Sequence, residues 1–84
     1  MKNIDLNKIK KAHFVGIGGI GVSAIARMMI GEGKKVSGSD SSESLITKEL
    51  EKIGAKVYIG HNAENISGDI DLLVYTPVNM VVKN

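Results

Sequence analysis

The sequence predicts a small α/β domain with a parallel sheet, and three observations support this. Four short segments rich in Val, Ile and Leu alternate with segments whose apolar residues recur at helical spacing. Gly33 and Gly54 follow the two helical patterns, where left-handed C-terminal caps are expected. A glycine-rich turn joins the first strand to the first helix, with Gly16, Gly18 and Gly21 spaced as G-x-G-x-x-G.

The elements are expected in a regular alternation after an extended or frayed lead-in over residues 1–10. We expect strands at residues 12–15, 34–38, 56–59 and 70–75, helices at 22–32 and 44–53, and one helical turn in the polar loop 61–68. The first helix should turn Ser23 and Arg27 away from the sheet, and present to it Gly21, Ala24, Ile25, Met28 and Met29. The second should bury Ile46, Leu50 and Ile53.

Strands that alternate with helices imply right-handed crossovers and a Rossmann-like, three-layer parallel sheet in the order 3-2-1-4, formed by a single domain over residues 1–84. Each crossover helix is expected to cover one face. The crevice between strands 1 and 4 is then the switch point where ligands bind. Four segments should meet there: the glycine turn, Ser39-Asp40, Gly60-His61 and Thr76-Pro77.

Composition excludes several classes of partner. The 84 residues carry 11 basic and 9 acidic side chains, and the net charge of +2 with three aromatic residues does not indicate nucleic-acid binding. A basic stretch before an apolar run imitates a signal peptide, but four glycines within six positions would weaken its helix. No run reaches the roughly 20 apolar residues that span a bilayer. With no cysteine, we expect a cytoplasmic protein without disulfides and without a membrane partner.

The glycine turn predicts a phosphate site. Gly16 permits the tight turn, Gly18 lets a pyrophosphate approach the backbone, and Gly21 lets the helix pack closely on the strand. Backbone amides at the start of the helix point outward, and the helix dipole adds partial positive charge behind them. The sequence therefore favours a ligand with a nucleoside diphosphate.

Other side chains near the strand ends are candidates for the same site. Asp40 lies about twenty residues past the turn, where a carboxylate accepts a ribose hydroxyl, although it could instead cap the second helix. His61 faces the predicted crevice, whereas His13 is expected to pack in the core or at an edge. Ser23 and Thr76 could each offer a hydroxyl to the phosphates.

The sequence contains no catalytic constellation. It lacks a P-loop motif, a nucleophile beside a base, paired carboxylates and a second histidine or cysteine that could complete a metal site. We therefore expect a binding module with no catalytic and no metal-binding residues.

The stretch His-Phe-Val-Gly-Ile-Gly-Gly-Ile-Gly-Val-Ser at residues 13–23 resembles the opening signature of the UDP-N-acetylmuramate–L-alanine ligase family of peptidoglycan synthesis. Members usually have methionine where Val22 stands. The similarity continues through residues 36–40, Thr47, Leu50, Gly54-Ala55, Gly60-His61 and Asn65-Ile66, and so covers about residues 6–77.

This resemblance implies a binding site for UDP-N-acetylmuramate. The loop would hold the diphosphate with Gly16, Ile17, Gly18, Gly19, Ile20, Gly21 and Ser23. The uridine end would face Ser39, Asp40, Ser41 and His61, and the opposite wall would be formed by Thr76 and Pro77. The intact ligase of this family uses ATP and Mg²⁺ in further domains, so the present chain should bind no cofactor itself and should not catalyse ligation.

After Pro77 the sequence departs from the family pattern, so residues 78–84 do not predict a fifth strand and the sheet edge beside strand 4 is expected to be open. Two alternatives use the same observations. One is the NAD(P)-binding domain of an oxidoreductase, which has the same glycines and an acidic residue like Asp40. The other is an interaction protein that has kept the fold and lost the ligand.

Overall fold

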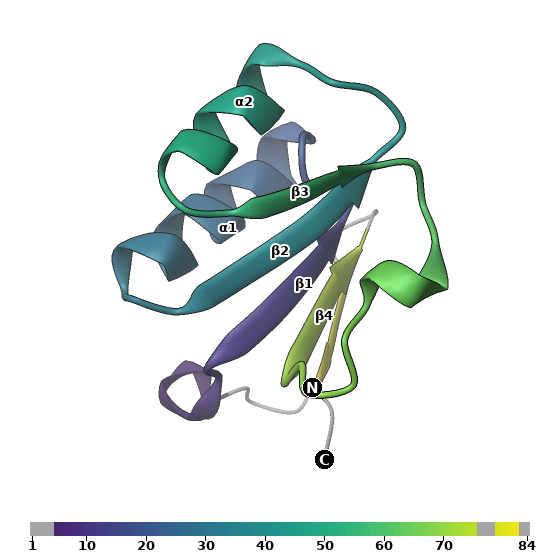
Figure 1. The fold of residues 1–84 in the computed structure, drawn as a ribbon. Helices are drawn as coiled ribbons and strands as arrows, with labels where there is room; N and C mark the ends of the chain where they lie inside the picture. The colour runs from purple at the N-terminus through teal and green to yellow at the C-terminus, as the bar shows by residue number, and fades with distance from the viewer. Residues whose placement is uncertain (1–4, 76–78, 83–84) are drawn as a thin grey trace.

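A computed structural model describes residues 5–75 and 79–82, which form one five-stranded sheet with two α-helices packed on it (Figure 1). The α-helices are α1 (Ile20–Gly31) and α2 (Leu45–Lys52), and the 3-10 turns are η1 (Leu6–Lys8) and η2 (Ala63–Asn65). The strands are β1 (Lys11–Val15), β2 (Lys35–Asp40), β3 (Lys56–Ile59), β4 (Leu72–Tyr75) and β5 (Asn79–Val82). The predicted small α/β domain is confirmed. Within the described residues, neither α-helix has both the length and the apolar character that a membrane span requires.

The sheet has the order β3-β2-β1-β4-β5, and its first four strands are parallel as predicted. The expectation of an open edge beside strand 4 is wrong, because β5 pairs antiparallel with β4 and places Asn79 opposite Tyr75. Only three residues separate these two strands. A parallel return needs a crossover of a dozen or more residues, so a short connection leaves only the antiparallel pairing. The sheet is therefore mixed.

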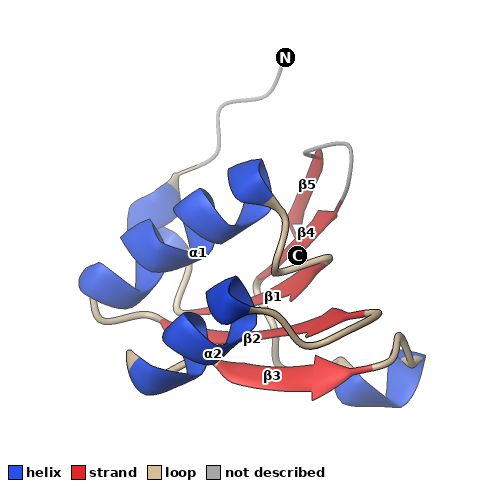
Figure 2. Cartoon of the chain, turned by 90° about the horizontal axis from the view of Figure 1, so that it is seen from above, coloured by secondary structure: helices blue, strands red, loops and turns tan. Residues whose placement is uncertain are grey.

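Both α-helices lie on the same face of the sheet (Figures 1 and 2), which corrects the expectation of one helix on each face. The side chains of the two helices meet, with Arg27 Nη2 of α1 lying 2.6 Å from Glu49 Oε2 of α2. β1, β2 and β3 lie next to one another in the sheet in that order, so both connections step across the sheet in the same direction. Because both are right-handed crossovers, their helices must lie on the same face. The described residues thus form two layers, with the segment around η2 beside the other face (Figure 1).

The core lies between β1 and the helices. Its buried apolar residues are Ile9, Ala12, Phe14, Ile17, Val22, Ala26, Met29, Val36, Leu50, Ala55, Leu72 and Val74. The predicted sheet-facing side of α1 is right only in part. Met29 is buried, Ile25 packs against the core and Arg27 is exposed, as predicted. Ser23, however, is buried, whereas Gly21, Ala24 and Met28 are exposed. In α2, Leu50 is buried as predicted, but Ile53 is 46 % exposed.

Glycine conformations mark the two helix ends as predicted. Gly33 follows α1 with φ +83°, and Gly54 follows α2 with φ +120°. Positive φ is accessible to glycine at little cost, so both helices stop where the sequence indicated.

Among the described residues of the lead-in before β1, Leu6–Lys8 form the η1 turn, which corrects the prediction of an extended or frayed segment there. Its η1 turn is followed by Ile9, which is buried in the core. Lys34 Nζ donates hydrogen bonds to the carbonyl oxygens of Leu6 and Ile9 at 2.6 and 2.8 Å. At the same end of the sheet, Asp71 Oδ2 accepts from the amides of Lys10 and Lys11, and these hydrogen bonds lower the pKa of Asp71.

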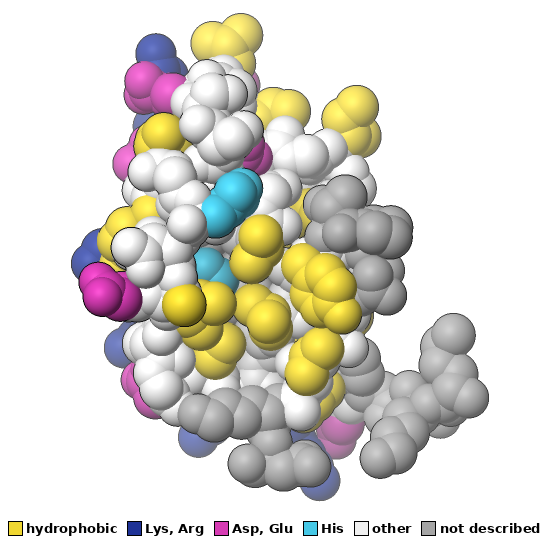
Figure 3. All heavy atoms as spheres, turned by 90° about the vertical axis from the view of Figure 1, so that its right-hand side faces the viewer, with side chains coloured by type: hydrophobic (Ala, Val, Ile, Leu, Met, Phe, Trp, Pro, Cys, Tyr) yellow, Lys and Arg dark blue, Asp and Glu magenta, His cyan; other side chains and the backbone are white. Residues whose placement is uncertain are grey.

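The sheet face opposite the helices carries His13, which is 1 % exposed. Its Nδ1 atom lies 2.8 Å from Ser37 Oγ on the neighbouring strand, and burial lowers the pKa of His13. Figure 3, which views the molecule from the right-hand side of Figure 1, shows histidine side chains beside a group of hydrophobic side chains. His13 therefore packs within the sheet, as predicted.

Candidate functional site

The glycine loop connects β1 to α1, and most of its amides are hydrogen-bonded inside the protein. The amides of Gly16 and Ile17 donate to the Ser39 carbonyl oxygen at 2.8 and 2.9 Å, and the Gly19 amide donates to the Gly16 carbonyl oxygen at 2.9 Å. Gly16 has φ +78°, a conformation that suits glycine in a tight turn. The loop is therefore held on the end of β2, and these three amides are not available to a ligand.

Three amides at the start of α1 have no hydrogen-bond acceptor in the described part of the chain, and two of them belong to the exposed residues Ile20 and Gly21. Gly19 is the N-cap residue and provides no side-chain cap, and the first hydrogen bond of the helix runs from the Ser23 amide to the Gly19 carbonyl oxygen at 2.8 Å. The amides of Ile20, Gly21 and Val22 consequently have no acceptor within residues 5–75 and 79–82. Such amides, together with the helix dipole, form a site for an anion.

Asp40 is the last residue of β2 and lies against the glycine loop. Its Oδ2 atom accepts from the Gly18 amide at 2.8 Å, and its Oδ1 atom accepts from the Ser41 amide at 2.8 Å. The Asp40 carbonyl oxygen accepts from the Gly60 amide at 2.7 Å. One residue thus ties together the segments that follow β1, β2 and β3.

Asp40 does not cap α2, so the helix-cap role that its position also allowed is wrong. The N-cap of α2 is Ser44, whose Oγ accepts from the Thr47 amide at 3.2 Å. In return, the Ser44 amide donates to Thr47 Oγ1 at 2.9 Å, which completes a capping box.

Ser39 and His61 form a second polar contact at the carboxyl ends of the strands. Ser39 is 2 % exposed, and its Oγ lies 2.7 Å from His61 Nδ1. His61 itself is exposed and borders a hollow of about 540 Å³ lined by residues 57–62 and 65. Because Nδ1 is engaged with Ser39, Nε2 is the ring atom of His61 left to contact a ligand.

The remaining predicted site residues are less favourably placed or cannot be assessed. The Ser23 side chain is buried, and its Oγ donates to the Ile20 carbonyl oxygen at 3.1 Å. The Ile17 side chain is fully buried in the core, so only its backbone borders the loop. Ser41 is exposed beside Asp40. Thr76 and Pro77 lie outside the described residues.

At two glycines of this region, Gly38 and Gly18, a side chain would collide with neighbouring atoms. A Cβ atom on Gly38 would lie 2.5 Å from the Phe14 carbonyl oxygen and 2.6 Å from Ile17 Cδ1. A Cβ atom on Gly18 would lie 2.8 Å from Asp40 Oδ2. Gly38 was predicted to lie in the second strand but was not among the predicted site residues, although a glycine within a strand is a signal of close approach by another chain segment.

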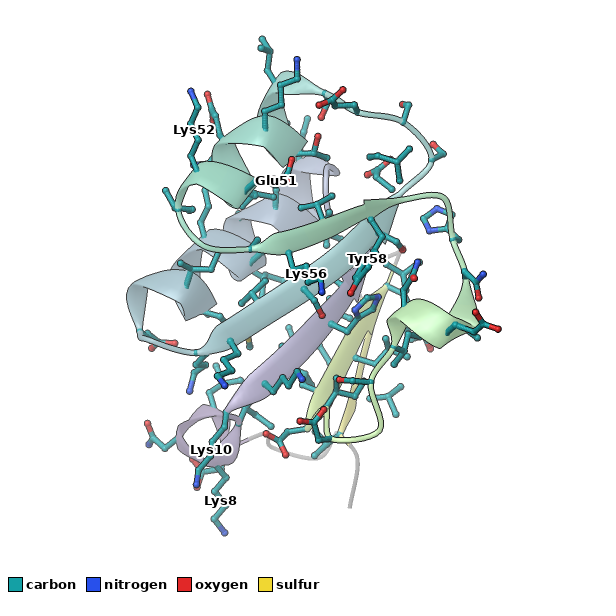
Figure 4. The ribbon with its side chains drawn as sticks, viewed as in Figure 1. Lys8, Lys10, Glu51, Lys52, Lys56 and Tyr58 are labelled. Carbon is teal, nitrogen blue, oxygen red and sulfur yellow. The ribbon has the colours of Figure 1, made fainter. Side chains whose placement is uncertain are left out.

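Three lysines that Figure 4 labels lie at separate places away from the glycine loop: Lys10 precedes β1, Lys52 ends α2 and Lys56 begins β3. Lys56 Nζ lies 5.4 Å from the centre of the Tyr58 ring. Lys52 lies at the negative end of the α2 dipole, whereas the last turn of α1 has no basic residue.

No group of three or more His, Cys, Asp or Glu side chains in the described residues is arranged to hold a metal ion. The sequence also lacks the G-x-x-x-x-G-K-[ST] motif of a P-loop. The residues of this chain therefore do not fit Mg²⁺ or the phosphates of ATP in the P-loop manner.

Comparison with known proteins identifies relatives over nearly the whole chain. Residues 11–84 match the family described as "Mur ligase family, catalytic domain". The UDP-N-acetylmuramate–L-alanine ligase of Clostridium kluyveri is 55 % identical over 74 residues, covering 88 % of this chain and 16 % of that protein. The ligase of the same name from Aquifex aeolicus is 56 % identical over 69 residues, covering 82 % of this chain and 15 % of its own length.

Two solved structures share the fold. The UDP-N-acetylmuramate–alanine ligase of Thermotoga maritima superposes with a TM-score of 0.74 and 45 % identity, covering 80 % of this chain and 15 % of that one. A murein peptide ligase from Psychrobacter arcticus superposes with a TM-score of 0.73 and 25 % identity, covering 79 % of this chain and 14 % of that one. The present chain thus spans between 14 % and 16 % of the length of these four relatives.

Proposed function

Because this chain belongs to the Mur ligase family, we propose that it binds UDP-N-acetylmuramate, the compound that appears in the names of its ligase relatives. The observation that carries the proposal is the row of open amides at Ile20, Gly21 and Val22, at the carboxyl end of the central strand. The diphosphate of the ligand accepts hydrogen bonds from these amides. Each hydrogen bond to a charged group contributes roughly 1.5–3 kcal/mol.

The uridine end of the ligand lies toward the segments that follow β2 and β3. His61 is the side chain best positioned to contact it, because its Nδ1 atom is hydrogen-bonded to Ser39 and its Nε2 atom remains for the ligand. Ser41 is exposed on the same side and offers its hydroxyl. Thr76 and Pro77 form the opposite wall in this proposal, as the family resemblance implies.

In a longer ligase, other domains would hold ATP and Mg²⁺ in the cytoplasm. ATP would phosphorylate the muramoyl carboxylate with release of ADP, and the amine of L-alanine would displace inorganic phosphate from the acyl phosphate to form the amide. The present chain then binds the UDP moiety and contributes no group that takes part in the reaction. Incubated alone with UDP-N-acetylmuramate, ATP, Mg²⁺ and L-alanine, it should release no inorganic phosphate.

Calorimetric titration of the chain with UDP-N-acetylmuramate, UDP and NADH tests the binding proposal. We expect UDP-N-acetylmuramate to bind, UDP to compete with it, and NADH to give no heat of binding. Binding of NADH without binding of UDP would favour the oxidoreductase alternative. If neither ligand binds at millimolar concentration to a folded chain, the proposal is wrong and the interaction-protein alternative gains support.

A further inference from the structure

Asp40 has both carboxylate oxygens engaged with the backbone of the site. Oδ2 accepts from the Gly18 amide and Oδ1 from the Ser41 amide, each at 2.8 Å. The Ser41 hydroxyl adds only a long contact of 3.5 Å to Oδ1. Charge-assisted hydrogen bonds of this kind are among the stronger ones in proteins, so they fix the loop relative to the end of β2.

The Gly18 position faces the carboxylate closely. A Cβ atom on Gly18 would meet Asp40 Oδ2 at 2.8 Å, Thr47 Cγ2 at 3.1 Å and Ser44 Oγ at 3.4 Å. Gly18 therefore lies close to both the Asp40 carboxylate and the first turn of α2. A half-buried carboxylate whose two oxygens accept from the Gly18 and Ser41 amides differs from one that is free to accept a ribose hydroxyl.

We propose that Asp40 is a positioning residue that acts on the ligand through the glycine loop, by holding the Gly18 amide and so fixing the direction of the Ile20, Gly21 and Val22 amides. This inference rests on the proposed function. It replaces the ribose-acceptor role that the spacing of Asp40 from the glycines had suggested. Under this proposal, Asp40 affects the affinity for any diphosphate, with or without a ribose.

The charge of Asp40 provides a way to separate the two roles. A carboxylate near a phosphate site repels the ligand, whereas the hydrogen bond to Gly18 needs only an acceptor oxygen. Asp40→Asn keeps one acceptor oxygen for the Gly18 amide, gives up the second acceptor that the Ser41 amide uses, and removes the charge. Asp40→Ala removes both acceptors and the charge. A positioning role therefore predicts that asparagine rescues binding and that alanine does not.

The test measures the affinity of the wild-type chain and of Asp40→Asn and Asp40→Ala for inorganic pyrophosphate and for UDP. We expect Asp40→Ala to weaken both ligands by roughly tenfold, and Asp40→Asn to bind both within about threefold of wild type or more tightly. The matched control is Glu43→Gln, which removes an exposed carboxylate from the same segment and should leave both affinities unchanged. Weaker UDP binding by Asp40→Ala, with pyrophosphate binding unchanged, would overturn the inference in favour of a ribose contact.

A ligand-free measurement distinguishes failure of this inference from failure of the proposed function. Hydrogen exchange of the Gly18 amide, followed by NMR, should accelerate by roughly tenfold or more in Asp40→Ala and much less in Asp40→Asn. An unchanged exchange rate in Asp40→Ala would show that the carboxylate does not hold the loop, and would overturn the inference whatever the ligands do. If wild type binds neither ligand while Gly18 exchange responds, the proposed function fails and the ligand role of Asp40 fails with it.

Discussion

The two α-helices begin in opposite ways, although they pack side by side on one face of the sheet. α2 begins at Ser44, whose side chain covers the Thr47 amide while Thr47 Oγ1 accepts from the Ser44 amide. α1 begins at Gly19, which has no side chain to offer, and its first three amides have no acceptor in the described part of the chain.

Unsatisfied amides at a helix start weaken the helix, and a side-chain cap typically contributes about 1 kcal/mol. Of the two α-helices, only α1 lacks a side-chain cap, and α1 follows the central strand at the switch point. This contrast supports the proposal that the start of α1, rather than that of α2, receives an anion.

The largest expected effect comes from adding a methyl group at Gly38, where β1 and the glycine loop pack closely on β2. In Gly38→Ala, the added Cβ would meet the Phe14 carbonyl oxygen at 2.5 Å and Ile17 at 2.6 Å, so β1, β2 or the loop must shift. We expect the free energy of unfolding in urea to fall by about 3 kcal/mol or more. In the control Gly31→Ala, the new methyl group has nothing within 4 Å, and the helix should gain about 0.5–1 kcal/mol. Equal effects of the two substitutions would show that Gly38 is not a point of close packing.

The next effect comes from giving α1 the kind of cap that α2 has. Gly19→Asp places a carboxylate at an N-cap whose φ of −68° and ψ of 151° suit any residue. The carboxylate should occupy the open amides and repel the phosphates, so affinity for UDP should fall at least about tenfold, or roughly 1.4 kcal/mol. Gly19→Ala is the control, since its Cβ makes the same 3.2 Å contact with the Gly16 carbonyl oxygen but offers no acceptor. Unchanged affinity in Gly19→Asp would mean that the phosphates bind elsewhere.

The converse substitution removes the cap from α2. Ser44→Ala should lower the free energy of unfolding by about 1 kcal/mol, because the Thr47 amide loses its acceptor. UDP affinity should not change, because this helix start is not expected to contact the ligand. Ser42→Ala, at an exposed serine of the same segment, should change neither quantity. Loss of UDP affinity in Ser44→Ala alone would extend the site to α2.

The smallest effect concerns the ion pair that joins the two helices. Arg27 and Glu49 are exposed by 43 % and 58 %, and exposed pairs contribute roughly 0.2–1 kcal/mol. A double-mutant cycle with Arg27→Met and Glu49→Gln should give a coupling energy in this range that falls as salt is added. A salt-independent coupling above about 1 kcal/mol would mean that the pair is more than a surface contact.

Much of the fold was predictable because it depends on local signals. Gly33 and Gly54 ended the helices, and the alternation of strands and helices led to the parallel order of the first four strands. The buried face of α1 was not predictable from periodicity, because α1 buries the polar Ser23 and exposes the apolar Ala24 and Met28. The common face of the two helices could have been predicted, since two right-handed crossovers in one direction require it.

The candidate site was predictable only in part. The G-x-G-x-x-G spacing located the loop, but it could not tell which amides the protein uses itself. That depends on contacts between distant residues: Asp40 with Gly18, and the Ser39 carbonyl oxygen with Gly16 and Ile17. The spacing of Asp40 suggested a ribose contact, since spacing cannot report the direction of a side chain.

The most direct test compares the two helix starts within one experiment. A ¹⁵N-labelled chain is titrated with UDP-N-acetylmuramate, and the amide signals of both first turns are followed by NMR. We predict progressive shifts at Ile20, Gly21 and Val22, and none at Ile46 and Thr47 of α2. Silent signals at the start of α1 under millimolar ligand, in a chain that remains folded, would contradict the account, and so would shifts confined to α2.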